Sequence, residues 1–493
     1  MENQGFQRSR LISSFLQIPH GNLSAFTDVG LEAAKSDTEL LAHFVAWNHK
    51  NGKVRDGKKA FPILSLRHLT KEDRDIAENA VAHLLLLDPR DLTSAYRYNK
   101  ELSKKEVIHG GWRNLLQQGL NHYLETREHT TKWWDRSVLS SRKAMTELYT
   151  VAHRKPSSRV QEILFNRTYP KGSIFTVVGE LKNMTPELAA QTILKHKIPF
   201  QVAIGAAPTI KHPDVVFALI EGMSGNELVN NTAMLRRLGA FESPTLKGAY
   251  EKALERAKGD KKVNTYKASK AAAGLDEETK KKVLRVQESH EAQMKKIPGD
   301  WVILVDKSGS MKTCIELGRK IAAAITTQIE GKSYLLFFDA TVHKFMEISG
   351  KTYEQIYIES RRVPAAGGTS IGIGMNYLHE KNIIVNGIAI VSDGGEHGLG
   401  WNLFPHAYRA YCNHAHVEPS VYLFHVPGDP NYLAQGCAQA GIDLTQYEAS
   451  HVDEYSLPNL IRALKPGRFG LVDEVMETPL LTLNDALKKE AAQ

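Results

Sequence analysis

The spacing of apolar residues changes near residue 300, and this change constrains the fold more than any other feature of the sequence. Before it, apolar residues recur at intervals of three and four, as on one face of an α-helix, and strand signals are scarce. After it, short apolar runs alternate with helical patterns, which is typical of a parallel sheet covered by helices on both faces. We therefore predict an all-α domain over residues 1–298 and a doubly wound α/β domain over residues 299–493.

Three prolines mark helix starts in the first part. Pro186, Pro199 and Pro213 follow one another at intervals of 13 and 14 residues. Proline suits the first turn of a helix because its missing N–H would have no partner there. Short helices without strands predict stacked helix pairs, a HEAT-like α-solenoid. The residues of the apolar stripes that follow the first and the last proline are Ala190, Ile193, Leu194, Val215, Val216, Leu219 and Ile220.

Residues 242–298 differ from the helical repeats before them. They are polar and rich in lysine, with a helical run over residues 277–296. We interpret this stretch as a solvated connecting segment. It ends at residues 297–300, whose Ile-Pro-Gly-Asp sequence predicts a turn.

The second part contains the expected alternation of strands and helices. We expect strands at residues 301–305, 334–338, 388–391 and 421–426, and helices at residues 315–329, 371–380 and 457–464. Ligands of a doubly wound sheet bind beyond the carboxyl ends of its strands. The loops at these ends are therefore where a site is expected.

Oxygen-bearing side chains gather in three of these loops. The first strand runs into Asp-Lys-Ser-Gly-Ser at residues 306–310, the loop 367–370 (Gly-Gly-Thr-Ser) precedes a helix, and the third strand ends in an aspartate. Hard oxygen ligands with only two carboxylates suit Mg²⁺ or Mn²⁺ in octahedral geometry. An open coordination position could accept an external carboxylate or phosphate, although the site could also serve stability alone. The predicted metal ligands are Asp306, Ser308, Ser310, Thr369 and Asp393.

This set of ligands resembles the metal-ion-dependent adhesion motif of von Willebrand factor A domains, and the similarity extends over residues 299–465. The first part resembles the TROVE module of the Ro autoantigen family. Four stretches carry this resemblance: residues 42–56, 149–157 (ending in His-Arg-Lys-Pro-Ser), 193–199 and 223–239. Because the two parts follow each other in the Ro order, the chain is identified as similar to a bacterial-type Ro ribonucleoprotein over nearly its whole length.

The Ro resemblance implies a ring of helical repeats closed by the metal-site domain. It further implies a hole that admits single-stranded 3′ ends of misfolded RNA, an outer face that binds small non-coding Y-type RNA, and an exoribonuclease partner in RNA quality control. His153 matches a histidine that contacts Y RNA in the family, and Arg136 falls at a basic position upstream of it. Ser140 and Ala152 replace a family arginine and serine, which puts strong Y RNA binding in doubt.

The charge of the chain is compatible with an RNA partner. Its formal net charge is +8 and its isoelectric point is near 9.0, which favours a polyanion only weakly because scattered lysines are usually solvated surface. Trp112, Trp133 and Trp134 could stack on bases or form helix-packing core. The basic residues expected to contact RNA phosphates are Lys132, Arg136, Arg142, Lys143, His153, Arg154, Lys155, Lys195, Lys197, Arg236 and Arg237, with Lys211 and His212 nearby.

Other features predict a monomeric, cytoplasmic, non-enzymatic protein. The three cysteines fit neither a disulfide framework nor a zinc site, the N-terminus lacks signal-peptide features, and no apolar run reaches the ~20 residues that span a bilayer. The Gly-Lys-Ser sequence at residues 331–333 resembles the end of a phosphate-binding loop, but Thr326 stands where that loop requires its first glycine. His414 and His416 read as a surface loop, and Asp339 as structural.

Two alternatives to an RNA-binding scaffold stay open at this point. The chain could be a protein-interaction adaptor whose metal site captures a partner's carboxylate, with RNA binding incidental. It could also be a metal-dependent phosphodiesterase, but a single hydroxyl-rich site lacks the paired carboxylates of a two-metal nuclease.

Overall fold

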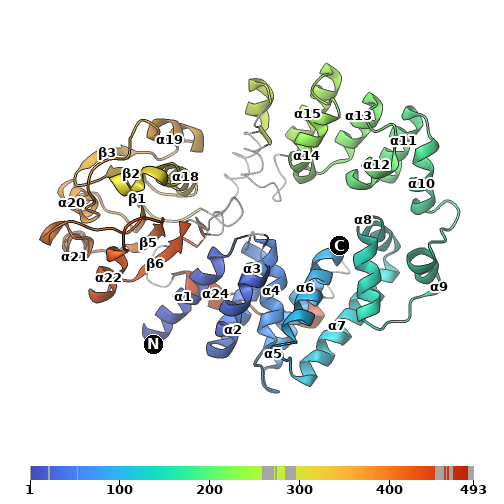
Figure 1. Ribbon diagram of the computed structural model, residues 1–493, viewed down its shortest axis with the longest axis horizontal. Helices are drawn as coiled ribbons and strands as arrows, with labels where there is room; N and C mark the ends of the chain where they lie inside the picture. The colour runs from blue at the N-terminus through green and yellow to red at the C-terminus, as the bar shows by residue number, and fades with distance from the viewer. Residues whose placement is uncertain are drawn as a thin grey trace. The chain divides into compact units, whose positions relative to one another are not determined.

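The computed structural model describes residues 2–19, 21, 23–52, 54–257, 271–272, 275–283, 296–449, 460–461, 463–465 and 470–486. They form two compact units (Figure 1). The first unit contains Met1–Leu84, Tyr98–Trp112 and Lys295–Leu483, and the second contains Leu85–Arg97, Arg113–Met294 and Asn484–Gln493. Helices precede and strands follow the predicted boundary at residue 298, but the first helices pack into the same unit as the sheet.

The first unit begins with helices α1 (Glu2–Gln17), α2 (Phe26–Ser36), α3 (Thr38–Asn51) and α4 (Arg55–Ser65). Phe15, Phe44 and Phe61 form their aromatic core, with ring centroids 4.7 to 5.1 Å apart. Helices α5 (Arg74–Leu85), α6 (Pro89–Leu102) and α7 (Gly110–His129) follow and continue into the second unit. No helix of the described residues is long and apolar enough to cross a membrane.

The second unit continues with helices that bury one apolar face each. They are α8 (Thr131–Val151), α9 (Ser158–Val160), the π-helical turn η2 (Gln161–Asn166), α10 (Ile174–Glu180), α11 (Pro186–His196), α12 (Phe200–Ala206), α13 (Pro213–Gly222), α14 (Gly225–Arg237) and α15 (Pro244–Ala257). As predicted, α11 and α13 begin at prolines, and Pro199 immediately precedes α12. The predicted stripes are buried except for Leu194, which is 40% exposed because the buried face of α11 runs through Ala189, Ala190 and Ile193.

The interpretation of residues 242–298 as a connecting segment is wrong for its first part. Helix α15 buries Leu246, Tyr250 and Leu254 in the core of the second unit. These residues recur at intervals of four, a helical stripe that the surrounding lysines and glutamates obscure in the sequence. Most of the predicted helical run, residues 284–295, lies outside the described residues.

The sheet of the first unit has six strands in the order β3-β2-β1-β4-β5-β6. They are β1 (Trp301–Asp306), β2 (Ser333–Phe338), β3 (Val342–Glu347), β4 (Gly387–Ser392), β5 (Ser420–His425) and β6 (Leu444–Glu448). The four predicted strands are confirmed, but the sheet is mixed, because β3 pairs antiparallel to β2. Only three residues separate β2 from β3, too few for a parallel crossover. The predicted alternation missed β3 because this edge strand is only half-buried.

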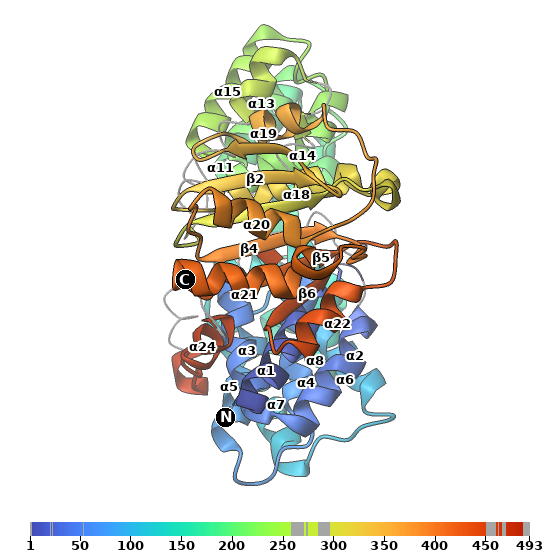
Figure 2. The same ribbon diagram turned by 90° about the vertical axis from the view of Figure 1, so that its left-hand side faces the viewer.

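Helices cover both faces of the sheet, as the apolar strands predict. Helices α20 (Gly372–Glu380), α21 (Phe404–Ala415) and α22 (Tyr432–Gln439) lie along one face of the sheet (Figure 2). Their buried side chains share a core with those of the strands. Helix α18 (Ile315–Thr326) packs on the other face, where Gly318 leaves room for Val305 and Val391. Among the described residues, this unit also contains helices α19 (Tyr353–Ser360) and α24 (Gly470–Met476). Half of the predicted helix 457–464 lies outside the described residues, as does Lys53 of the TROVE-like motif.

The outer edge of β6 is covered by the first helix of the chain. Gln17, at the end of α1, donates a hydrogen bond from Nε2 to Gln446 O at 3.2 Å and accepts one at Oε1 from Glu448 N at 3.0 Å. One side chain thus satisfies a backbone acceptor and a backbone donor of an edge strand, which would otherwise be open to another chain.

Candidate metal centre and nucleic-acid interface

Two carboxylates lie at the carboxyl ends of neighbouring strands. Asp306 is the last residue of β1, Asp393 follows β4, and the two strands pair in parallel. Both side chains are fully buried. Their hydrogen-bond donors come mostly from the strand-end loops: Ser308 N and Ser392 Oγ each donate to Asp306 at 2.7 Å, and Gly395 N donates to Asp393 at 3.0 Å.

The predicted hydroxyl ligands lie in two loops that are tied together. Ser308 Oγ and Ser310 Oγ share a hydrogen bond of 3.1 Å in the loop after β1. Gly309 N of this loop donates to Gly367 O, at 2.9 Å, in the loop that carries the buried Thr369. The structure therefore brings Asp306, Ser308 and Ser310 together and fixes the Thr369 loop against them.

The electrostatics of this cluster fit a divalent cation. Burial raises the pKa of Asp306 to about 6, and the charge of Asp393 adds to the rise, so the two carboxylates repel each other. The neighbouring Lys307 does not compensate them, because its Nζ donates to Asp339 at 2.7 Å. Although burial opposes ionisation of Asp339, this hydrogen bond, one from Thr341 N and the charge of His343 lower its pKa to about 2. Asp339 thus holds Lys307, in agreement with a structural role.

The sequence prediction missed a second layer of groups around Asp393. His425 Nε2 bonds to Asp393 O at 2.9 Å, and its Nδ1 bonds to Glu448 Oε2 at 2.8 Å. Asp429 N donates to Asp393 Oδ2 at 3.1 Å. A methyl group at Gly428 would lie 2.2 Å from Asp393 Oδ2, so the backbone approaches this carboxylate as only glycine permits. Glycines 394, 395 and 428 beyond the strand ends were the available sequence signal.

Two of the predicted RNA-contacting arginines hold the helices of the second unit instead. Arg142 is half-buried, and its guanidinium donates to Ile163 O at 2.6 Å and to the Tyr169 hydroxyl at 2.9 Å. Arg154 lies beside Glu128, with Arg154 Nε 3.3 Å from Oε1. Both guanidiniums are already partnered, so they are poor candidates for phosphate contacts.

The other predicted cations are exposed on the second unit. Arg136 of α8 donates to Lys197 O, at 3.3 Å, at the end of α11, so two segments predicted separately lie side by side. Lys197 and His153 both have left-handed backbone conformations, which end α11 and the turn after α8. The exposed side chains that have no ion-pair partner within the described part of the chain are Lys132, Lys143, His153, Lys155, Lys195, Lys197 and Arg237; Arg236 is exposed as well.

The net charge of the whole chain is concentrated in this region. Residues 131–211 contain thirteen Lys and Arg and five Asp and Glu, a formal charge of +8. The entire chain has 63 and 55 of these residues, also +8, so the remaining residues balance. The segment runs from the start of α8 to the turn before α13. The sequence analysis identified many of these basic residues, and the scarcity of acidic residues between them is what gives the segment its net charge.

The tryptophans are largely structural. Trp134 is fully buried and donates from Nε1 to the Tyr149 hydroxyl at 3.2 Å. Arg127 lies over the half-buried Trp133 ring, 4.0 Å from its centroid, and Trp112 donates to Thr70 O at 3.1 Å. The interpretation of Trp134 as helix-packing core is therefore confirmed.

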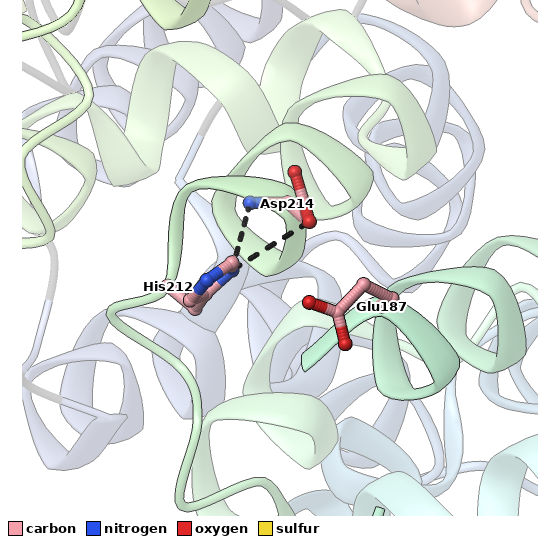
Figure 3. A group of neighbouring side chains, drawn as sticks. All are labelled: Glu187, His212 and Asp214. Atoms are coloured by element: carbon pink, nitrogen blue, oxygen red, sulfur yellow. Dashed lines mark hydrogen bonds and ion pairs between the residues drawn. The ribbon is translucent and has the colours of Figure 1, made fainter. Parts of the chain in front are cut away.

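Two histidine-containing groups do not form convincing metal sites. Glu187, His212 and Asp214 have ligand atoms within 4.8 Å of one another (Figure 3). Glu187 and Asp214 lie in the first turns of α11 and α13, and His212 caps α13, so helix capping explains all three. His414 lies in the last turn of α21, not in the predicted surface loop, and bonds to Asn382 Oδ1 at 2.7 Å.

Comparison with known proteins shows similarity of structure only. No protein-family model matches the chain, and no curated protein matches its sequence. Among solved structures, the Ro protein of Deinococcus radiodurans is similar with a TM-score of 0.63 and 14% sequence identity, over 92% of this chain and 99% of that one. An aerotolerance-related membrane protein from Bacteroides fragilis matches 33% of this chain and 96% of its own length at 15% identity, with a TM-score of only 0.26.

Proposed function

We propose that this chain, which has the fold of the Deinococcus Ro protein, is a Ro-type RNA-binding protein. The observation that carries the proposal is the concentration of the whole net charge of +8 in residues 131–211. Exposed cations that neutralise phosphates release counterions from a nucleic acid, and this supplies affinity without base recognition. Cations such as Lys132, Lys143 and Lys155, which have no carboxylate partner within the described part of the chain, are suited to this role.

The finer parts of the proposal follow the Ro resemblance. The chain would bind Y-type RNA and the single-stranded 3′ ends of misfolded RNA on two separate surfaces. It would act in RNA quality control in the cytoplasm, as a monomer that presents RNA to an exoribonuclease and performs no catalytic step itself.

The proposal is tested by RNA binding at several salt concentrations. We expect a structured RNA with a single-stranded 3′ tail to bind, with an affinity that falls steeply as salt rises. Replacing both Arg136 and Lys197 with glutamate should reduce the slope of log K against log[salt] by the amount expected for the loss of about two phosphate contacts. The control is Lys252→Glu, an exposed lysine of α15 outside residues 131–211. Failure of the wild-type protein to bind any of these RNAs at low salt would refute the proposal.

The metal centre supports a second candidate function, a Mg²⁺- or Mn²⁺-dependent protein adaptor. Asp306, Ser308, Ser310, Thr369 and Asp393 would hold the ion, which would supply an electrophilic position for a partner's carboxylate. Leu399 and Trp401, in the loop between β4 and α21, are 88% and 80% exposed and suit a protein contact. His397 N donates to Thr369 O at 3.0 Å, so this loop is attached to the metal-site loop.

A pulldown distinguishes the two functions. Wild-type protein is compared with Asp306→Ala, each with and without nuclease treatment. A partner that is lost from the variant whether or not RNA is present favours the adaptor. A partner that nuclease removes from both proteins favours the RNA-binding function. Steady cleavage of RNA by the pure protein, abolished by Asp306→Ala, would contradict the non-enzymatic assignment.

A further inference from the structure

Two aromatic side chains are exposed in a fixed segment of the second unit. Residues 165–172, from the end of η2 towards α10, form a continuous run of exposed residues. Phe165 is 37% exposed and Tyr169 is 39% exposed. Neither residue was considered in the sequence-based predictions.

Hydrogen bonds hold this segment in place although it is exposed. Thr168 N donates to Glu162 O at 2.9 Å and closes the π-helical turn, whose C-cap Arg167 is left-handed. The Thr176 hydroxyl and Ser173 N donate to Pro170 O at 2.8 and 3.0 Å. π-Helical turns are frequent at functional sites.

Each ring is also positioned by a buried neighbour. Phe165 makes an edge-to-face contact with the buried Tyr149, with centroids 6.3 Å apart. Tyr169 is stacked on the buried Phe175 at 5.5 Å, and its hydroxyl accepts a hydrogen bond from Arg142 at 2.9 Å. Because these contacts fix the rings before any ligand arrives, little conformational entropy is lost when a ligand stacks on them.

The charges around the rings match a phosphate backbone. Arg167 and Lys171 lie in the same segment, both exposed and without a carboxylate partner among the described residues. Lys143, which follows Arg142 in α8, is also exposed and has no carboxylate partner among the described residues. Within residues 161–171, Glu162 is the one acidic residue. Exposed aromatic rings flanked by cations are the combination that binds single-stranded nucleic acids, because every base has a face that can stack.

We propose that residues 165–171 form a subsite for unpaired nucleotides of single-stranded RNA. Bases stack on Phe165 and Tyr169, and the adjoining phosphates lie against Arg167 and Lys171. This inference rests on the proposed RNA-binding function and assigns the recognition of unpaired RNA to one segment. A double helix cannot use this subsite because its base faces are covered by base stacking.

The test compares a single-stranded RNA oligonucleotide that contains 2-aminopurine with a blunt RNA hairpin. Phe165→Leu and Tyr169→Leu keep an apolar side chain but remove the aromatic face. Each should weaken binding of the oligonucleotide roughly 5- to 150-fold, since base stacking is worth about 1–3 kcal/mol. Both should also reduce the quenching of 2-aminopurine fluorescence and leave hairpin binding unchanged. Tyr169→Phe, which keeps the ring and loses the hydroxyl, should bind the oligonucleotide nearly as well as the wild type.

Phe217→Leu is the matched control, because Phe217 in α13 is 38% exposed and lies outside the basic segment. Wild-type affinity of the Phe165 and Tyr169 variants for the oligonucleotide would overturn the subsite and leave the proposed function intact. Equal losses for hairpin and oligonucleotide, or an equal loss in the control, would also overturn it. Absence of RNA binding by the wild-type protein would refute the proposed function itself. Thermal melting identifies variants that fail to fold. If the ring variants do not fold, the double variant Arg167→Ala with Lys171→Ala is the second test. Loss of its affinity for the oligonucleotide, with a smaller salt dependence of binding, supports the subsite, and wild-type affinity overturns it.

Discussion

Gln17 offers a direct test of how the first helix is attached to the sheet. Replacing it with alanine removes both hydrogen bonds between α1 and β6. A hydrogen bond contributes about 1 kcal/mol net, and a buried group left without a partner costs about 1–3 kcal/mol. Because both backbone groups are only partly buried, water can replace some of the loss. We therefore expect Gln17→Ala to lower the free energy of unfolding by about 1–3 kcal/mol.

Urea denaturation measures this change, and hydrogen exchange locates it. The amide of Glu448 should exchange faster in Gln17→Ala, because its acceptor is gone, while amides of β1 keep their protection. Gln4→Ala is the matched control, since Gln4 is an exposed glutamine of the same helix. Gln17→Glu retains the acceptor for Glu448 N and loses the donor to Gln446 O, so it should still protect Glu448. Unchanged exchange at Glu448 in Gln17→Ala, or an equal effect of Gln4→Ala, would refute the reasoning.

Three further predictions concern the metal-centre region and the helices. Burial raises the pKa of Glu396 to about 7. The contribution of this carboxyl to the free energy of unfolding is therefore complete below its usual pKa near 4.5 and is lost as pH rises through 7. Glu396→Gln should remove on the order of 3 kcal/mol of this pH dependence, as measured by urea denaturation from pH 4.5 to 8. Mg²⁺ or Mn²⁺ at a hundredfold excess over Kd should stabilise the protein by about 2.7 kcal/mol, and Asp306→Asn should abolish this shift in Tm; a wild-type Tm insensitive to both ions would argue against the metal site. Gly428→Ala should destabilise the protein by about 1–3 kcal/mol, because its methyl group meets Asp393. Gly248→Ala, in open space within α15, should stabilise it by up to about 1 kcal/mol. Equal effects of the two variants on the urea midpoint would contradict the close approach of Gly428 to Asp393.

Central buried strands and proline-marked helices could be predicted because their determinants are local. β1 and β4 are buried on both faces, so their sequences are continuous apolar runs, and the polar residues at their ends were easy to recognise. The edge strands β3 and β6 are only partly buried, and their mixed sequences resemble loops. The apolar stripe of α15 was hidden among charged residues for a similar reason: burial depends on what a helix packs against.

The candidate sites divide in the same way. The clustering of Asp306, Ser308 and Asp393 was predictable because parallel strands bring their carboxyl ends to one edge. The role of each cation could not be predicted, because it depends on partners far away in the sequence. Arg142 donates to the carbonyl of Ile163 and the hydroxyl of Tyr169, while the adjacent Lys143 is exposed. Adjacent basic residues look equivalent in a sequence, and only their hydrogen bonds separate them.

The sequence by itself determined the change from helices to buried strands, the polar residues at the strand ends and the location of the positive charge, since each depends on residue type and local spacing. The tertiary structure decided which elements share a core, which cations and rings are exposed, and how Gln17 covers the β6 edge, more than 400 positions away in the chain. The physical reason is that hydrogen bonds and burial depend on proximity in space, and the folding of the whole chain creates that proximity.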